Sequence, residues 1–375
     1  GWLRGVGYHE SVAGLIDRRW LDSYGPDRPI RVQHRGGRLW VLNTRGIDYL
    51  GQYCEGNFPV GMNEDSGHLF DEDAWLRTIT GKRPPDLSDV SQRLASYGVS
   101  AVTDMTPQND IRVAELLIQQ QIEGGLCQDV LMAGTLYPES ALPISDKPSS
   151  SLRVGPFKIH LHEARLPDFE VLCDMIHKSH LAQRPIAVHC VTEIELVFTL
   201  AALQETGTLE GDRIEHASVA PPQLLQQMKA LGVIVVTQPN FILERGDQYL
   251  EDVDACDLSS LYRCESFFRS GIRLAGGTDA PFGQPDPWLA ISAAVNRKTF
   301  KGQIVNSAEA LSPEQAVELF MGDIESPGKP RVIAVGEPAD LCLLDCRWGT
   351  ARTALTSNRV RATWCGGKLI YNRVD

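Results

Sequence analysis

Short apolar runs recur along the middle of the chain, and stretches with helical periodicity separate most of them. The predicted strands are Val99–Thr103, Val130–Gly134, Phe157–Leu161, Ile186–Cys190, Arg213–Glu215, Val233–Thr237 and Ile272–Gly276. The predicted helices are Asp110–Glu123, Asp168–Ala182, Glu193–Glu205, Pro222–Leu231 and Leu258–Ser270. Strands and helices that alternate at this spacing form βα units around a parallel sheet.

Seven such units in a row favour a (β/α)8 barrel over a doubly wound sheet. No glycine-rich G-x-G-x-x-G turn follows the early strands, which argues against a dinucleotide-binding fold. We therefore predict an α/β protein with a TIM-like barrel whose first strand is missing from the sequence.

The two ends of the chain do not show this alternation of strands and helices. Near the start, strands are expected at Pro29–His34 and Leu39–Leu42, and Asn57–Asp73 is predicted to be a loop. Near the end, a capped helix at Ser312–Met321 precedes a strand at Leu341–Leu344 and a hairpin formed by Arg361–Trp364 and Lys368–Tyr371. We predict three parts: a segment at 1–85, a barrel at 86–332 and a small C-terminal β unit at 333–375.

The composition of the chain limits the kinds of binding partner that we expect. The net charge is −12 and no basic stretch offsets it, which argues against nucleic acid or an anionic membrane as the main partner. No apolar stretch approaches the roughly 20 residues of a membrane span. The nine cysteines are odd in number and contain no C-x-x-C pair, as expected of reduced thiols in a cytoplasmic protein. We expect a small-molecule substrate, and the oligomeric state, including a homo-oligomer, stays open.

Four polar residues stand on or just after separate predicted strands: Lys158, His189, His216 and Asp279. The carboxyl ends of parallel strands meet at one face of a barrel, so these side chains should lie close together. Imidazoles bind zinc as neutral donors, and an aspartate can both ligate a metal and take a proton from water. A lysine becomes a ligand only after its neutral amine reacts with carbon dioxide to give a carbamate.

Each of these residues also has an ordinary structural interpretation. A single histidine at a strand end is more often a hydrogen-bonded core or loop residue than a ligand. The ordered set with Asp279 favours function for His189 and His216, whereas Lys158 alone is evenly balanced because lysines are common at barrel mouths.

Four further residues are weaker candidates for substrate contact. Period-two alternation places Lys158, His160 and His162 on one strand face, which brings His162 and Glu163 near the barrel mouth. Asp104 either lines the mouth or caps a helix. Trp288 either packs in the core or stands at the mouth as an aromatic gate.

The chain resembles the amidohydrolase superfamily, and specifically amidohydrolase family 3. The resemblance covers essentially the whole chain, and its most specific elements are the Arg213–His216 (RIEH) and Gly277–Pro281 (GTDAP) segments. The other segments that carry it are Gly1–Tyr8, Arg28–Arg35, Gly98–Asp104 and Val335–Leu341.

The resemblance implies roles for the four strand-end residues. His189 and His216 correspond to the metal ligands of the fifth and sixth barrel strands, and Asp279 to the ligand and general base of the eighth. Lys158 corresponds to the fourth-strand lysine, which family members carbamylate to bridge two metals. Residues 1–85 correspond to an insertion between the first and second strands.

One family feature is missing from the sequence. The first strand of the family carries a His-x-His pair. No such pair precedes Val99, because His9, His34 and His68 are isolated histidines. The sequence starts at Gly1 rather than at a methionine, and we expect that N-terminal residues are absent from it. The alternatives are a processed or engineered start, or a natural sequence with a degenerate binuclear site.

These features predict a metal-dependent amidohydrolase, a hydrolase that acts on a non-peptide C–N bond in an amide or cyclic amide. An N-terminally complete chain is expected to bind one or two divalent ions, with zinc as the expected metal and Lys158 as a site of carbamylation. Two alternatives stay open: an isomerase or deaminase on the same scaffold, and a catalytically inactive or truncated chain that keeps the fold.

Overall fold

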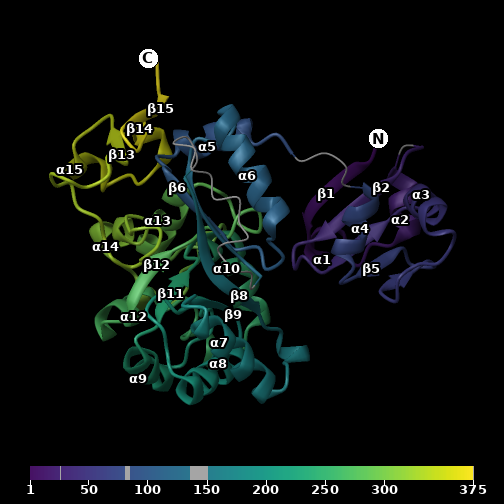
Figure 1. Ribbon diagram of the computed structural model, residues 1–375, viewed down its shortest axis with the longest axis horizontal. Coiled ribbons are helices and arrows are strands. Elements are labelled where there is room, and N and C mark those ends of the chain that lie inside the picture. Colours follow the sequence, from purple (N-terminus) through teal and green to yellow (C-terminus); the bar gives the residue numbers. More distant parts are fainter. Residues whose placement is uncertain (26, 81–84, 136–150, 375) are drawn as a thin grey trace. The chain divides into compact units, whose positions relative to one another are not determined.

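The computed structural model describes residues 1–25, 27–80, 85–135 and 151–374, and the chain divides into two units, Gly1–Pro85 and Asp86–Asp375 (Figure 1). Each unit has hydrophobic clusters of its own. In the part of the chain that the structure describes, no helix is long and apolar enough to cross a membrane.

The first unit is a five-stranded mixed sheet with the order β1-β2-β3-β5-β4. Its strands are β1 (Leu3–Tyr8), β2 (Ile30–His34), β3 (Leu39–Leu42), β4 (Met62–Asn63) and β5 (His68–Phe70). Its helices are α1 (Glu10–Ala13), α2 (Arg18–Tyr24), α3 (Thr44–Cys54) and α4 (Asp73–Thr80). Only β1 and β2 pair in parallel, and this pairing sets Tyr8 opposite His34.

Asn43 ties the strands of this first unit to its longest helix. Its side-chain Oδ1 accepts hydrogen bonds from Gly46 N–H, which caps α3, and from Ile30 N–H on β2, both at 2.8 Å. The buried side chains of Trp40, Leu42 and Leu50 pack beside this junction.

The second unit is built on a seven-stranded parallel sheet in which strand order follows the sequence, β12-β11-β10-β9-β8-β7-β6. The strands are β6 (Ala101–Asp104), β7 (Asp129–Gly134), β8 (Leu152–His160), β9 (Ile186–Cys190), β10 (Arg213–His216), β11 (Ile234–Thr237) and β12 (Arg273–Gly276). All seven predicted barrel strands are thereby confirmed, and their sequential order is that of a barrel rather than of a doubly wound sheet.

Helices follow the strands as the βα pattern requires. They are α5 (Ser88–Ser96), α6 (Ile111–Glu123), α7 (Phe169–Leu181), α8 (Glu193–Thr206), α9 (Pro222–Leu231), α10 (Asn240–Asp252), α11 (Ala255–Leu258), α12 (Cys264–Ser270), α13 (Pro287–Asn296), α14 (Pro313–Glu318) and α15 (Trp348–Ala351), with short 3-10 turns η2 (Glu163–Arg165), η3 (Ser307–Glu309) and η4 (Ser357–Arg359). Neighbouring helices α7 and α8, α8 and α9, and α9 and α12 contact each other along the sheet (Figure 1).

The C-terminal segment adds a three-stranded antiparallel sheet, β13 (Leu341–Leu344), β14 (Val360–Cys365) and β15 (Lys368–Asn372). It packs on α5, where the Thr363 hydroxyl donates to the Ala95 carbonyl at 2.7 Å. The predicted strand and hairpin are confirmed, and the predicted cap of α14 is present as a Ser312–Gln315 capping box.

Two local predictions were wrong, and one long helix was missed. The predicted loop at Asn57–Asp73 contains the short strands β4 and β5, because β5 pairs with β3 over a buried Leu69. The predicted helix Leu258–Ser270 is interrupted between α11 and α12, where Tyr262 takes a positive φ of +47° that no helix allows. Helix α10 was not predicted at all.

Candidate active site at the carboxyl ends of the strands

The two faces of the seven-stranded sheet differ in chemistry. Ile159, Val188 and Ile214 are buried against the helices in the main hydrophobic cluster. Successive side chains on a strand point to opposite faces. Lys158, His189 and Glu215 therefore lie on the face away from these helices, which is the interior face of a barrel.

The ladder register orders these polar residues in rows. His160 on β8 is opposite His189 on β9, which is opposite Glu215 on β10. One row nearer the start of the strands, Lys158 is joined through Ala187 to Arg213. The sheet thus places two imidazoles and a carboxylate side by side, one row beyond the side chains of Lys158 and Arg213.

Four imidazoles follow one another across this end of the sheet. The ring centroids of His162 and His160 are 4.4 Å apart, those of His160 and His189 4.3 Å, and those of His189 and His216 4.5 Å. The predicted ligands His189 and His216 are therefore neighbours, and His162 lies on the same side as the sequence predicted.

His216 has the tautomer that a metal ligand needs. Its Nδ1 lies 2.6 Å from Gln238 Oε1, and Gln238 Nε2 donates to the Val236 carbonyl, which fixes the orientation of the amide. Because Oε1 can only accept, Nδ1 carries the proton and the lone pair of Nε2 is left available. Metal-bound histidines usually donate their other ring N–H in this way.

Burial also keeps the histidines in the form that binds metal. It lowers the pKa of His189 far below its usual range, and it lowers the pKa of His216 to about 4, with Lys158 adding to the effect. Burial likewise lowers the pKa of the Lys158 amine, although the Glu215 carboxylate opposes this change. Both rings are thus neutral at pH 7, as metal coordination requires.

Asp279 stands in a turn three residues after the end of β12. Burial raises the pKa of its carboxyl group to about 6, and the positive charges of Arg245 and Lys158 oppose this rise. The turn is closed by a 2.7 Å hydrogen bond from Phe282 N–H to the Asp279 carbonyl. A carboxylate with this pKa can accept a proton near neutral pH.

Backbone strain is concentrated at the same strand ends. His216, Ala217 and Asp279 have φ values of +73°, +44° and +54°, a region that residues other than glycine rarely adopt. Each such residue costs about 1 kcal/mol or more and persists where the surrounding structure holds it, most often at functional sites.

Buried polar atoms without hydrogen-bond partners gather here as well. Among the described residues of the second unit they are Arg213 Nε, Glu215 Oε1, Ser218 Oγ, Thr237 Oγ1 and Asn240 Oδ1. The first two lie 2.7 Å apart as an ion pair, but without the alignment of a hydrogen bond. Such atoms are rare in native structures, and their gathering on and just after β10 and β11 fits a site completed by a bound group.

The weaker candidates for substrate contact differ in their exposure and in their hydrogen bonds. The Glu163 side chain is exposed, next to His162. Asp104 accepts a hydrogen bond from Thr106 N–H at 2.9 Å, so its carboxylate caps the turn after β6. Trp288 is 7% exposed in the main core, and its indole N–H donates to the Tyr97 carbonyl at 3.0 Å, which makes it a packing residue rather than an aromatic gate.

Sequence reasoning missed Gln238, Glu215 and Arg245. Glu215 carried a signal, since a charged residue inside an apolar strand points to a polar interior. Gln238 directly follows the end of β11, the position that drew attention to the other strand ends. Arg245 carried no signal, because its place depends on the unpredicted helix α10.

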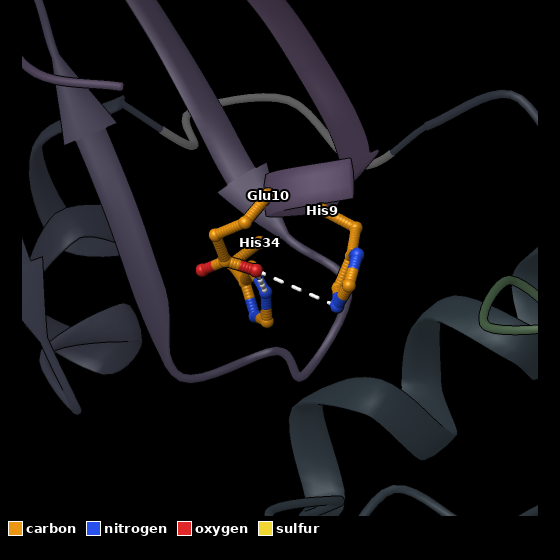
Figure 2. A group of neighbouring side chains, drawn as sticks. All are labelled: His9, Glu10 and His34. Atoms are coloured by element: carbon orange, nitrogen blue, oxygen red, sulfur yellow. Dashed lines mark hydrogen bonds and ion pairs between the residues drawn. The ribbon is translucent and has the colours of Figure 1, made fainter. Parts of the chain in front are cut away.

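A group of side chains of metal-ligating types also lies in the first unit. The ligand atoms of His9, Glu10 and His34 all lie within 4.8 Å of one another (Figure 2), and they form the only such group of three among the described residues. His189, His216 and Asp279 therefore do not form so tight a group, and their convergence on one ion stays a prediction.

The hydrogen bonds of the first-unit group disfavour a metal. His34 Nδ1 accepts from Gly36 N–H at 3.1 Å, and His9 Nδ1 accepts from Ser11 N–H at 3.2 Å. Both Nε2 atoms, which face Glu10 Oε2 at 3.1 and 3.5 Å, must then carry the proton. This arrangement is the opposite of that at His216: the Glu10 carboxylate accepts a hydrogen bond from His34 Nε2 and lies 3.5 Å from His9 Nε2.

Comparisons with known proteins show the family to which the chain belongs. The sequence profile of the amidohydrolase family matches residues 2–371. The putative amidohydrolase YtcJ of Bacillus subtilis strain 168 is 23% identical over 435 residues, which cover 99% of this chain and 80% of that protein. The N-substituted formamide deformylase of Arthrobacter pascens is 25% identical over 445 residues, with 99% of this chain and 79% of that protein covered.

A solved structure shares the fold. An uncharacterized metal-dependent hydrolase from Pyrococcus furiosus superimposes with a TM-score of 0.63 at 23% identity, over 85% of this chain and 72% of that chain.

Proposed function

Because the chain belongs to the amidohydrolase family, a family of metal-dependent hydrolases, we propose that it hydrolyses a C–N bond in an amide or cyclic amide. His189, His216 and Asp279 would hold the divalent metal. The observation that carries this proposal is the Gln238–His216 hydrogen bond, which leaves His216 Nε2 free for a metal beside the ring of His189. The name of the relative from Arthrobacter pascens, a formamide deformylase, supports the C–N bond class.

The residues divide the chemistry among them. A bound divalent metal would polarise the substrate carbonyl and acidify a water molecule. Asp279 would accept a proton from the attacking water and donate it to the leaving nitrogen, a role that suits a carboxyl group with a pKa of about 6. Gln238 holds the His216 ring in place throughout.

Lys158 is proposed to be carbamylated, and zinc is proposed as the metal. Carbamate formation requires a neutral amine, and burial lowers the pKa of Lys158 towards that form. Two imidazoles with a carboxylate are a common zinc ligand set.

We also propose how the parts of the chain correspond to a complete barrel. Strands β6 to β12 would be strands two to eight, residues 1–85 an insertion between the first and second strands, and residues 333–375 the C-terminal β unit. The nine free cysteines support a reducing compartment, and we propose the cytoplasm.

Metal content and turnover of one variant test the proposal together. The purified chain is analysed for bound metal, loaded with zinc and assayed on N-alkylformamides, N-acyl amines and small cyclic amides. His216→Ala should remove turnover while its circular dichroism stays native, whereas His177→Ala, at an exposed position on α7, should keep it. Undiminished turnover by metal-stripped His216→Ala would contradict the proposal.

A further inference from the structure

Arg245 on α10 is held in place on two sides. Its guanidinium lies over the ring of Phe241, one helical turn earlier, with 3.7 Å from Cζ to the ring centroid. Its Nη2 donates to the Phe282 carbonyl at 2.6 Å. A cation fixed on its face and at one donor cannot swing freely into solvent.

This cation is bound to the turn that carries the proposed catalytic carboxylate. Phe282, whose carbonyl binds Arg245, also closes the turn that Asp279 opens, through its N–H to the Asp279 carbonyl at 2.7 Å. In agreement with this geometry, the charge of Arg245 lowers the pKa of both Asp279 and His216.

Arg245 forms no ion pair with a carboxylate of the residues that the structure describes. Within the described residues, no carboxylate oxygen lies within 4.0 Å of its guanidinium nitrogens. The adjacent Glu244 is engaged elsewhere, because its Oε1 accepts from Asn240 Nδ2 and Gln284 N–H at 3.1 and 3.0 Å. Among the described residues, the Phe282 carbonyl is the one hydrogen-bond acceptor for the five N–H donors of Arg245.

We propose that Arg245 binds a carboxylate of the substrate, so that the preferred substrates are amides that carry a free carboxylate group. The inference rests on the function proposed above and narrows its substrate class. A planar guanidinium pairs with a carboxylate through two parallel hydrogen bonds, a geometry that a neutral amide does not match. The alternative is that Arg245 only braces the Asp279 turn.

Binding of matched hydroxamates separates these two roles. The probes are the monohydroxamates of succinate, glutarate and adipate, each paired with the carboxamide in place of its free carboxylate. Affinities for the zinc-loaded chain are measured by calorimetry. The carboxamide probes report the metal site alone, and the ratio within a pair reports recognition of the carboxylate.

At least one carboxylate probe should bind about ten- to one-hundred-fold more tightly than its carboxamide, the range of a charge-assisted hydrogen bond. Arg245→Met should reduce this ratio to near one without changing the affinity for the carboxamide probe, and Arg245→Lys should keep part of the ratio. The control is Arg269→Met, an equal charge change at an exposed site on α12, which should leave the ratio unchanged.

Two results would overturn the inference. The first is a ratio of one for every wild-type pair, and the second is an Arg245→Met variant that weakens both members of a pair equally, which is the result of bracing alone. Failure of all carboxamide probes to bind would instead remove the metal site, and with it the proposed function on which this inference depends.

Discussion

Gln238 fixes the tautomer of His216 through one hydrogen bond, at 2.6 Å from Oε1 to Nδ1. Two histidines of the first unit have the opposite arrangement, because backbone N–H groups donate to Nδ1 of His9 and His34. The hydrogen-bond partner of Nδ1 therefore decides whether Nε2 presents a lone pair or a proton. Because an acceptor faces Nδ1 of His216, we place the metal at this histidine.

Replacing Gln238 should weaken metal binding without removing a ligand. Gln238→Leu removes the acceptor for Nδ1–H, and loss of such an outer partner lowers metal affinity by about 10- to 100-fold. Competition with a chelating dye measures the zinc affinity. Gln238→Glu keeps an acceptor and should bind zinc more tightly than Gln238→Leu, and equal affinity of the wild type and Gln238→Leu would contradict the assignment.

Asp279 should destabilise the metal-free chain at neutral pH. Its folded pKa of about 6 lies above the unfolded value of about 3.9, so the folded state binds more protons between these values and loses stability as pH rises through this window. Asp279→Asn should therefore stabilise the chelator-treated protein by on the order of 2–3 kcal/mol at about pH 8 and by little at about pH 4. Urea denaturation measures the difference.

The control for this measurement is Asp65→Asn, at an exposed carboxylate of the first unit. It should leave the free energy of unfolding nearly unchanged at both pH values. An Asp279→Asn variant that gains no stability at the higher pH would show that the carboxylate is not held in a desolvated position.

At the scale of elements, the start of α10 holds the turn that carries Asp279. Asn240 Nδ2 donates to the Thr278 carbonyl at 3.1 Å, and Glu244 Oε1 accepts from Gln284 N–H at 3.0 Å. Gly283 fits into this junction because it has no side chain. A methyl group there would lie 2.2 Å from the Thr278 carbonyl oxygen and 2.4 Å from Asn240 Nδ2.

Gly283→Ala should displace this turn. Neither neighbour can move without breaking the hydrogen bond between them, so the substitution should cost about 1–3 kcal/mol of folding stability, as overpacking does. It should also lower turnover, because Asp279 moves with the turn. Gly349→Ala is the matched control, since nothing lies within 4 Å of its added methyl group. Thermal melts and assays of both variants check the prediction, and a native-like Gly283→Ala would argue against a rigid junction.

The strands and the site were predictable from sequence to different degrees. Apolar runs ending in His189, His216 and the Asp279 turn located three strand ends, because a buried parallel strand must be apolar and its carboxyl end is where polar groups gather. Helix α10 was missed because Asn240–Asp252 has only a partial apolar stripe and no side-chain cap. Asn240 and Arg245 lie on this helix and were missed with it, since their roles depend on contacts with residues about forty positions away.

At the scale of the whole molecule, the two units have separate cores. The cluster around Trp40 and Leu50 consists of residues of the first unit, and the cluster around Ile176 and Val188 consists of residues of the second. Truncation of a fully buried leucine or isoleucine costs about 2–5 kcal/mol of stability, and this loss should appear in the unit whose core is opened.

Hydrogen exchange followed by mass spectrometry should therefore resolve two independent responses. Leu50→Ala should speed amide exchange in β3, α3 and β5 and leave β8 to β10 unchanged, because neither β8 to β10 nor the helices packed on them contribute to the cluster around Leu50. Ile176→Ala should do the reverse, since Ile176 packs between α7 and the sheet of the second unit. If either substitution speeds exchange equally in both units, they unfold as one cooperative body, and the site residues of the second unit would then depend for their stability on the core of the first.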